Sequence, residues 1–353
     1  MKIGINGFGR IGRLALRLLL EDDELDVVAI NDLCDAESLA YLLKYDTNHR
    51  GFHTDEISFD QNNIIYNGKK IRVLSHKDPE SIPWDVLGVE VVLECSGLFT
   101  SLDSAKKHIK AGAKKVVISA PAKGDVKTIV YNVNDDILNG SEQVISAASC
   151  TTNCLAPVLK VINDNYTIKK GFMTTVHAYT NDQATLDVTH KKGILSRRGR
   201  AAAANIVPST TGAALAIGKV IPSLDGKLDG NAYRVPVSDG SLIDVVLELS
   251  ENTSVEEINN LFMNSQNETL KFTMDPIVSS DVLGMHYGSL VDGLLTNVLT
   301  TDGKQLVKIV AWYDNEMSYT AQMIRTTKSL INKSNGVNYL FKKLTKYLIF
   351  NNI

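Results

Sequence analysis

The sequence predicts an α/β protein with a doubly wound parallel sheet in its first half and an α+β domain with a largely antiparallel sheet in its second. Short apolar runs of strand length alternate with helical patterns in the first half, and this alternation is typical of a parallel sheet covered by helices. From about residue 169 the strand-like runs are longer and fewer helices separate them, which favours antiparallel pairing. A glycine-rich turn also joins the first strand to the first helix.

The individual elements follow from these patterns. In the first half we expect strands at 2–6, 27–31, 90–95 and 115–119 and helices at 11–20 and 101–111. In the second half we expect a joining helix at 150–165, strands at 171–178, 232–237, 242–249 and 306–313, and a late helix at 316–331. The predicted domains are therefore 1–149, completed by the late helix, and 150–315, followed by a C-terminal extension at 332–353.

Composition excludes several classes of protein. The net charge of -3 gives no general attraction for nucleic acid, and neither a signal peptide nor a membrane-spanning apolar run is visible. Four cysteines in 353 residues do not form a disulfide framework and indicate a reducing compartment. We expect a soluble cytoplasmic protein without a nucleic-acid or membrane partner. His49 and His53 are interpreted as a loop pair, and no metal site is expected.

A dinucleotide-binding site is predicted at the first turn. Gly7, Gly9 and Gly12 form G-x-G-x-x-G between a strand and a helix, where glycines permit a tight turn, close approach to a pyrophosphate and close packing of helix on strand. Asp32 ends the second strand about 20 residues later, as this Rossmann-type fingerprint requires. Its carboxylate would bind the ribose hydroxyls and repel a 2′-phosphate, so NAD is favoured over NADP. A mere glycine turn with a capping aspartate is the less favoured alternative.

Cys150 is the predicted nucleophile. It lies where a strand ends and a helix begins, and a helix N-terminus stabilises a thiolate, so its pKa is expected to fall. Cys154 follows in C-x-x-x-C spacing, which is not the redox C-x-x-C. Cys34, Cys95 and Cys154 are interpreted as buried small apolar residues.

His177 is the candidate base for this thiol, although a histidine on a strand is more often structural. The loop after it, at 181–200, ends in three arginines within four residues. Such a cluster indicates an anion-binding site, with a solvated turn as the alternative.

The segments INGFGRIGR, AASCTTNCLAP, HAYTNDQ, RRGRAAA, PSTTGAA, YRVPV and WYDNE together resemble phosphorylating glyceraldehyde-3-phosphate dehydrogenases. They occur in that family's order and cover the chain to about residue 331. The resemblance implies NAD-dependent oxidation of D-glyceraldehyde 3-phosphate to 1,3-bisphosphoglycerate, with inorganic phosphate as second substrate and a homotetrameric assembly. It also implies that Cys150 forms a thioester and that His177 lowers the thiol pKa and transfers protons.

The resemblance further implies the binding residues. The cofactor contacts would come from Gly7, Gly9, Arg10, Ile11, Gly12, Asp32, Lys77, Ser119 and Asn315, with Asn315 holding the nicotinamide carboxamide. The phosphate groups would be held by Ser149, Thr151, Thr180, Arg198, Thr211, Gly212 and Arg234, with Asp182 positioning Arg234. The sequence departs from the family pattern at Leu215, at Met317, at 188–189, in the length of the loop after His177 and beyond residue 331.

Two alternative functions remain open. An erythrose-4-phosphate dehydrogenase usually alters the aspartate after the second strand and the TTG motif, and both are intact here. A non-catalytic binding protein on the same fold is opposed by the intact pair of Cys150 and His177.

The C-terminal extension carries four lysines and apolar residues at helical spacing. It is interpreted as a segment packed on its own subunit, with weak membrane attachment as the alternative.

Overall fold

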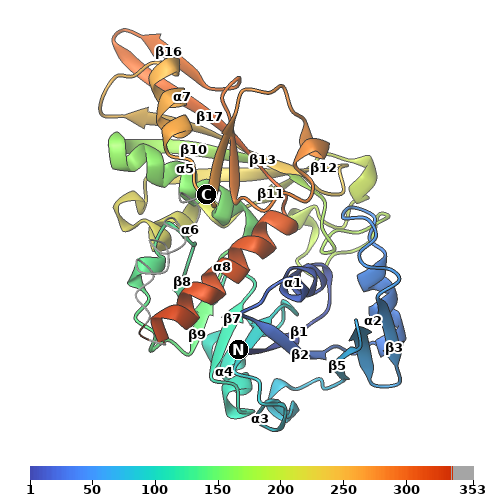
Figure 1. The fold of residues 1–353 in the computed structure, drawn as a ribbon. Helices are drawn as coiled ribbons and strands as arrows, with labels where there is room; N and C mark the ends of the chain where they lie inside the picture. Colours follow the sequence, from blue (N-terminus) through green and yellow to red (C-terminus); the bar gives the residue numbers. More distant parts are fainter. Residues whose placement is uncertain (335, 337–353) are drawn as a thin grey trace, which may run out of the picture. The chain divides into compact units, whose positions relative to one another are not determined.

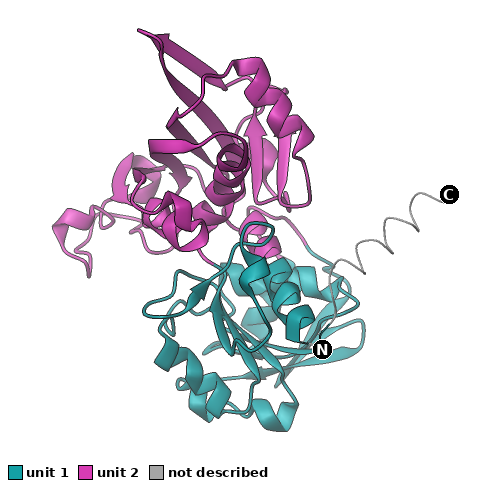
Figure 2. Cartoon of the chain, turned by 90° about the vertical axis from the view of Figure 1, so that its left-hand side faces the viewer, with its two compact units in different colours: residues 1–44, 52–147, 323–353 teal, residues 45–51, 148–322 magenta. Residues whose placement is uncertain are grey.

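The computed structural model describes residues 1–334 and 336 and divides the chain into two compact units. Unit 1 comprises residues 1–44, 52–147 and 323–353, and unit 2 comprises residues 45–51 and 148–322 (Figure 2). The short segment 45–51 thus belongs to unit 2, although the predicted domains assigned it to the first. Most of the C-terminal extension at 332–353, namely residue 335 and residues 337–353, lies outside the described residues.

Unit 1 is built on a nine-stranded sheet with the order β3-β4-β5-β2-β1-β6-β7-β9-β8 (Figure 1). The strands are β1 (Lys2–Asn6), β2 (Asp26–Asn31), β3 (Ile57–Asp60), β4 (Asn63–Tyr66), β5 (Lys69–Leu74), β6 (Val91–Glu94), β7 (Lys115–Ile118), β8 (Lys127–Thr128) and β9 (Val144–Ser146). The helices are α1 (Arg10–Leu20), α2 (Ala36–Lys44), α3 (Trp84–Leu87) and α4 (Leu102–Lys110). At one edge of the sheet the pairs β3–β4 and β4–β5 are antiparallel. All pairs that follow in the sheet order, from β5–β2 to β9–β8, are parallel.

Both faces of this sheet are buried, as the doubly wound prediction requires. Val91 and Leu93 of β6 enter a core with residues of α1 and α2. Val92, between them, enters a second core with Trp84 and with Ala105 of α4. Because successive strand residues point to opposite faces, these two cores are the two covered faces of one sheet.

Unit 2 is built on an eight-stranded sheet with the order β11-β12-β10-β13-β17-β15-β14, with β16 paired to β17 (Figure 1). The strands are β10 (Ile168–Ala178), β11 (Val207–Thr210), β12 (Leu228–Val235), β13 (Ser241–Leu249), β14 (Leu270–Thr273), β15 (Ser289–Asp292), β16 (Asn297–Thr301) and β17 (Lys304–Tyr313). The helices are α5 (Cys150–Asn165), α6 (Ala213–Val220) and α7 (Val255–Asn264). The pairs β10–β12 and β14–β15 are parallel and the other pairs are antiparallel, which confirms the largely antiparallel sheet.

Helix α5 packs on β10, β13, β15 and β17, and ten of its residues are buried in consequence. Helix α8 (Met317–Ser334) begins in unit 2, and its residues from Met323 onward belong to unit 1. No helix among the described residues is long and apolar enough to cross a membrane.

Candidate active site and cofactor-binding edge

Cys150, the predicted nucleophile, is the first residue of α5. Ser149 lies just before it in an extended conformation, and its hydroxyl accepts the backbone N–H of Thr152 at 3.1 Å, which caps the helix. Cys150 is therefore held at the positive end of the helix dipole. Cys154, one turn later, is fully buried and directs its thiol at the carbonyl oxygens of Ala311 and Trp312. The two cysteines thus occupy different environments, as expected.

His177, the predicted base, lies on the neighbouring strand β10. The Nε2 atom of His177 is 3.4 Å from the Sγ atom of Cys150. The Nδ1 atom of His177 is 2.7 Å from the backbone carbonyl of Ala178, which can only accept a hydrogen bond. The Nδ1 atom therefore carries the ring hydrogen, and the lone pair of Nε2 faces the thiol. This is the arrangement required to accept a proton from Cys150.

The expected fall in the thiol pKa is wrong for this chain. Burial raises the pKa of Cys150, and this effect outweighs the guanidinium of Arg234 and the nearby backbone N–H groups, which act in the opposite direction. Burial also lowers the pKa of His177 to about 3, and the positive charge of Arg234 adds to that shift. Thiol and imidazole therefore face each other as neutral groups, and the unprotonated nitrogen of His177 is free to accept a proton.

Arg234 joins the base to the predicted phosphate site. It stands opposite His177 in the parallel pairing of β10 and β12. Its Nη1 atom lies 3.1 Å from Nδ1 of His177, and it donates to the carbonyl of Ala178 at 3.0 Å and to the hydroxyl of Thr180 at 3.0 Å. The hydroxyl of Thr180 donates in turn to Asp182 at 2.5 Å. A guanidinium and a hydroxyl in contact are suited to bind a phosphate.

Asp182 pairs with a different arginine from the one expected. Its carboxylate accepts from Arg198 and reaches Arg234 only through the hydroxyl of Thr180. The pKa of Asp182 is lowered overall: burial raises it, but the bond from Thr180 and the charges of Arg198 and Arg234 prevail. Asp182 therefore holds Arg198 directly and orients Thr180.

The residues predicted around the second phosphate differ in exposure. The hydroxyl of Thr151 is turned inward and lies 2.9 Å from the hydroxyl of Tyr313, so its backbone N–H is the group left for an anion. The hydroxyl of Thr211 accepts the N–H of Ala213, and Gly212 is the exposed residue before α6.

Arg198 also borders a cavity of about 410 Å³. The lining is basic and polar and consists of Lys192, Leu195, Ser196, Arg197, Arg198, Pro208, Ser209, Thr210, Asn231 and Tyr233.

Asn315 is positioned by Ser241. The backbone N–H of Ala178 donates to the hydroxyl of Ser241 at 3.0 Å, and that hydroxyl donates to Oδ1 of Asn315 at 2.7 Å. The amide NH₂ of Asn315 is therefore oriented by a residue that also bonds the strand carrying His177. Both residues are buried.

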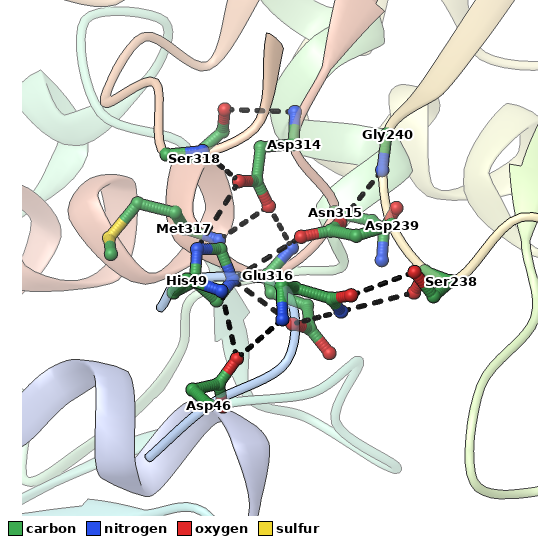
Figure 3. Close-up of polar contacts among 12 residues, drawn as sticks. Asp46, His49, Ser238, Asp239, Gly240, Asp314, Asn315, Glu316, Met317 and Ser318 are labelled. Atoms are coloured by element: carbon green, nitrogen blue, oxygen red, sulfur yellow. Dashed lines mark hydrogen bonds and ion pairs between the residues drawn. The ribbon is translucent and has the colours of Figure 1, made fainter. Parts of the chain in front are cut away.

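A cluster of charged residues flanks Asn315 (Figure 3). Nε2 of His49 lies 3.3 Å from Asp239 and 3.1 Å from Glu316, and Nδ1 lies 3.9 Å from Asp314. Burial opposes the charged imidazole, but hydrogen bonds to Asp239 and Glu316 outweigh it and raise the pKa of His49 to about 9. Burial and the charge of Asp239 raise the pKa of Asp314 to about 7.

This cluster attaches segment 45–51 to unit 2. Among the described residues, one group of three His, Cys, Asp or Glu side chains has atoms close enough to ligate a metal ion. It consists of His49, Asp239 and Asp314. The protonated imidazole supplies the positive charge that these carboxylates require, so the contacts among them already account for the cluster. Sequence reasoning missed it because its members are separated by up to 267 residues.

The cofactor-binding edge of unit 1 has the predicted glycine geometry. Gly7 adopts a φ of +90°, and a Cβ atom there would lie 2.5 Å from the backbone nitrogen of Ser96. A Cβ atom at Gly12 would lie 2.1 Å from the carbonyl oxygen of Gly7, whereas nothing lies within 4 Å of such an atom at Gly9. Two glycines are thus required by close packing, and the third leaves an open approach to the start of α1, which fits a pyrophosphate.

Asp32 connects this turn to the second strand. Its Oδ2 atom accepts the N–H of Phe8 at 2.7 Å, and its Oδ1 atom accepts the N–H of Cys34 at 3.1 Å. Arg10 and Ile11 open α1, Lys77 is exposed after β5, and Ser119 follows β7. The predicted cofactor residues of unit 1 therefore lie at the carboxyl ends of parallel strands, where such sheets bind ligands.

Comparisons with known proteins identify the family of the chain. Residues 149–315 match the family model for the C-terminal domain of glyceraldehyde 3-phosphate dehydrogenase, and residues 1–102 match the model for its NAD-binding domain. Glyceraldehyde-3-phosphate dehydrogenase of Clostridium pasteurianum is 58% identical over 325 residues, covering 92% of this chain and 97% of its own. The protein of that name from Streptococcus pyogenes is 55% identical over 327 residues with the same coverage. The chain belongs to the glyceraldehyde-3-phosphate dehydrogenase family.

As a member of the glyceraldehyde-3-phosphate dehydrogenase family, the chain is an NAD-dependent oxidoreductase, as its sequence predicted. One cysteine differs from its interpretation: Cys34 is exposed, whereas Cys154 is buried and Cys95 is half-buried. The exposure of Cys34 follows from its place in the loop after Asp32, where the chain leaves the sheet.

Proposed function

We propose that the chain oxidises D-glyceraldehyde 3-phosphate and transfers the acyl group to inorganic phosphate, giving 1,3-bisphosphoglycerate. The observation that carries this proposal is the 3.4 Å contact between Cys150 and the unprotonated nitrogen of His177, beside the guanidinium of Arg234. The enzyme would act in glycolysis and gluconeogenesis in the cytoplasm, in keeping with four cysteines that are all free.

The first step forms a covalent bond between Cys150 and the aldehyde. Sγ attacks the carbonyl carbon while Nε2 of His177 takes the thiol proton and returns it to the new oxygen, which gives a hemithioacetal. Arg234 and Thr180 would hold the substrate's C3 phosphate during this attack. The backbone N–H of Cys150, at the start of α5, would stabilise the developing oxyanion.

The second step oxidises that adduct. A bound NAD would supply the acceptor for the hydride that leaves the carbon. His177 takes the hydroxyl proton at the same time, so the adduct becomes a thioester and the imidazole becomes charged. Because His177 is buried beside Arg234, this charge is unfavourable and the proton is readily passed on. Asp32, Lys77 and Asn315 are proposed to orient the cofactor.

The third step releases the product. Inorganic phosphate attacks the thioester carbon, the C–S bond breaks, and Cys150 leaves as a thiolate that regains a proton through His177. Ser149, Thr151, Thr211 and Gly212 are the residues proposed to hold the attacking phosphate, with Arg198 between the two phosphate positions. These groups supply hydroxyl and backbone donors and one arginine, which suit a divalent anion.

A homotetramer is proposed as the assembly. Unit 2 exposes several large apolar side chains, which an interface with other subunits would cover. They include Phe172, Ile194, Leu195, Ile206 and Leu215. Sedimentation of the purified chain tests this assembly, and a monomer at micromolar concentration would contradict it.

The experiment that tests the function measures NADH absorbance with D-glyceraldehyde 3-phosphate, with and without inorganic phosphate. We expect rapid NADH formation only with phosphate, and loss of turnover in Cys150→Ser. A higher kcat/KM for erythrose 4-phosphate, independent of phosphate, would replace the proposal with the related dehydrogenase. No turnover with either aldehyde, despite NAD binding, would favour a non-catalytic binding protein.

A further inference from the structure

A buried carboxylate lies beneath the cofactor-binding edge of unit 1. Glu94 ends β6, and only 1% of its surface is exposed. Its Oε1 atom accepts both the N–H and the hydroxyl of Ser96, at 2.8 and 2.5 Å. Its Oε2 atom accepts the side-chain amide of Asn6 at 2.6 Å and bonds Nε2 of His108 at 2.9 Å. A buried carboxylate is stable only when such donors replace water.

His108 is a donor to this carboxylate in a fixed tautomer. Its Nδ1 atom lies 3.0 Å from Nε1 of Trp84, and an indole N–H can only donate. Nδ1 must therefore accept, and the ring hydrogen lies on Nε2, where it points at Glu94. All four groups that bond Glu94 therefore act as hydrogen-bond donors, which matches a side chain whose two oxygens only accept.

The bonds continue from Glu94 across the sheet. Asn6 ends β1, and its Oδ1 atom accepts the amide of Asn31, which ends β2, at 2.8 Å. Asn31 also donates to the carbonyl of His76 at 2.9 Å and accepts the N–H of His76 at 2.8 Å. The path joins the ends of β6, β1 and β2 and the loop after β5, which are neighbours in the sheet order.

Asn6, Asn31 and His76, which form this path, each lie next to a predicted cofactor-binding residue in the sequence. Asn6 precedes Gly7, Asn31 precedes Asp32, and His76 precedes Lys77. The backbone nitrogen of Ser96 lies against Gly7, 2.5 Å from the position that a Cβ atom would take. The network therefore fixes the backbone from which the cofactor-binding residues project.

We propose that Glu94 is a positioning residue for the dinucleotide. Through Ser96, Asn6 and Asn31 it fixes the relative positions of the glycine turn, Asp32 and Lys77. The proposal rests on the proposed use of these residues to bind NAD. Glu94 acts through its neighbours, so it should govern NAD affinity and leave the chemistry at Cys150 unchanged.

The test compares Glu94→Gln with Asn134→Ala. Glutamine keeps the shape but replaces one acceptor oxygen with an NH₂ group, which must face existing donors. Asn134 is also buried in unit 1, and its side chain accepts the N–H of Val130 and donates to the carbonyl of Thr128, so its loss removes two buried hydrogen bonds away from the cofactor residues. The dissociation constant for NAD is measured by calorimetry, alongside the melting temperature and kcat at saturating NAD.

We expect Glu94→Gln to raise the dissociation constant for NAD about tenfold or more, because small displacements of positioned groups are costly, with kcat at saturating NAD little changed. Asn134→Ala should lower the melting temperature and leave NAD affinity unchanged. Unchanged NAD affinity in Glu94→Gln, or an equal loss in both variants, would overturn the proposal. If Glu94→Gln does not fold, Asn31→Ala, which cuts only the link to His76 and the bond to Asn6, must show the same pattern. Failure of the wild-type chain to bind NAD would instead refute the proposed function.

Discussion

Because His177 is neutral when buried, the free energy of unfolding should fall at acidic pH. The substitution His177→Asn should reduce this dependence on pH. An unfolded chain carries histidine with a pKa near 6.5, whereas burial and Arg234 hold the pKa of folded His177 at about 3. Between these values the unfolded state binds a proton that the folded state does not. The free energy of unfolding must therefore fall as the pH drops below 6.5 toward 3.

The size of this effect follows from the two pKa values. At pH 5.0, relative to pH 7.5, the linkage removes about 2 kcal/mol from the free energy of unfolding. Only 3% of the surface of His177 is exposed, so solvent screens little of it. His177→Asn lacks the titrating group, and its stability should decline less over the same range by about 2 kcal/mol.

The assay is urea-induced unfolding of the wild-type chain and His177→Asn at pH 7.5 and 5.0, followed by circular dichroism. Nuclear magnetic resonance of the chain with labelled histidine provides a second measurement, in which the signal lost in the variant should not titrate between pH 8 and 5. Equal acid sensitivity of the two proteins, or a His177 signal that titrates near pH 6.5, would refute the reasoning.

Three further changes address the proposed site. Cys150→Ser should abolish NADH formation while the fold and NAD binding persist, and Cys154→Ser should keep substantial turnover; equal losses would contradict the assignment of the nucleophile. Arg234→Leu should reduce kcat/KM for the aldehyde far more than NAD affinity, since each charge-assisted bond is worth about 1.5–3 kcal/mol, and wild-type kcat/KM would show that the phosphate lies elsewhere. NAD should be used far better than NADP because a 2′-phosphate would meet Asp32, and comparable kcat/KM for the two cofactors would exclude that role.

The regular elements were predictable where apolar periodicity is strong. The strand at 2–6 and the helix at 150–165 have the predicted bounds, and the glycine turn lies between β1 and α1 as expected. The antiparallel pair β3 and β4 was missed because each strand has only four residues, which is too short for a periodic pattern to stand out. Helix α7 was also missed, although Ser254 and Glu257 form a capping box that precedes it.

The contact between the two predicted catalytic residues could be expected from the sequence, but their electrostatics could not. Motif positions identified Cys150 and His177, and the structure brings them into contact. The thiol pKa was predicted with the wrong sign because desolvation depends on burial, which local sequence does not report. The cluster around His49 joins segments up to 267 residues apart. The pairing of Asp182 with Arg198 depends on the path of the loop between them, and no sequence pattern indicates either arrangement.

Helix α8 has a consequence for the order in which the chain can fold during synthesis. Met323, Ile324, Leu330 and Ile331 belong to the apolar core of unit 1, together with Ile3 and Ile5 of the first strand. A nascent chain that has emerged only to residue 147 therefore lacks part of that core and leaves apolar surface uncovered. Unit 1 must therefore wait for residues 323–331 before its packing is complete, and a fragment ending at residue 147 should aggregate when expressed alone.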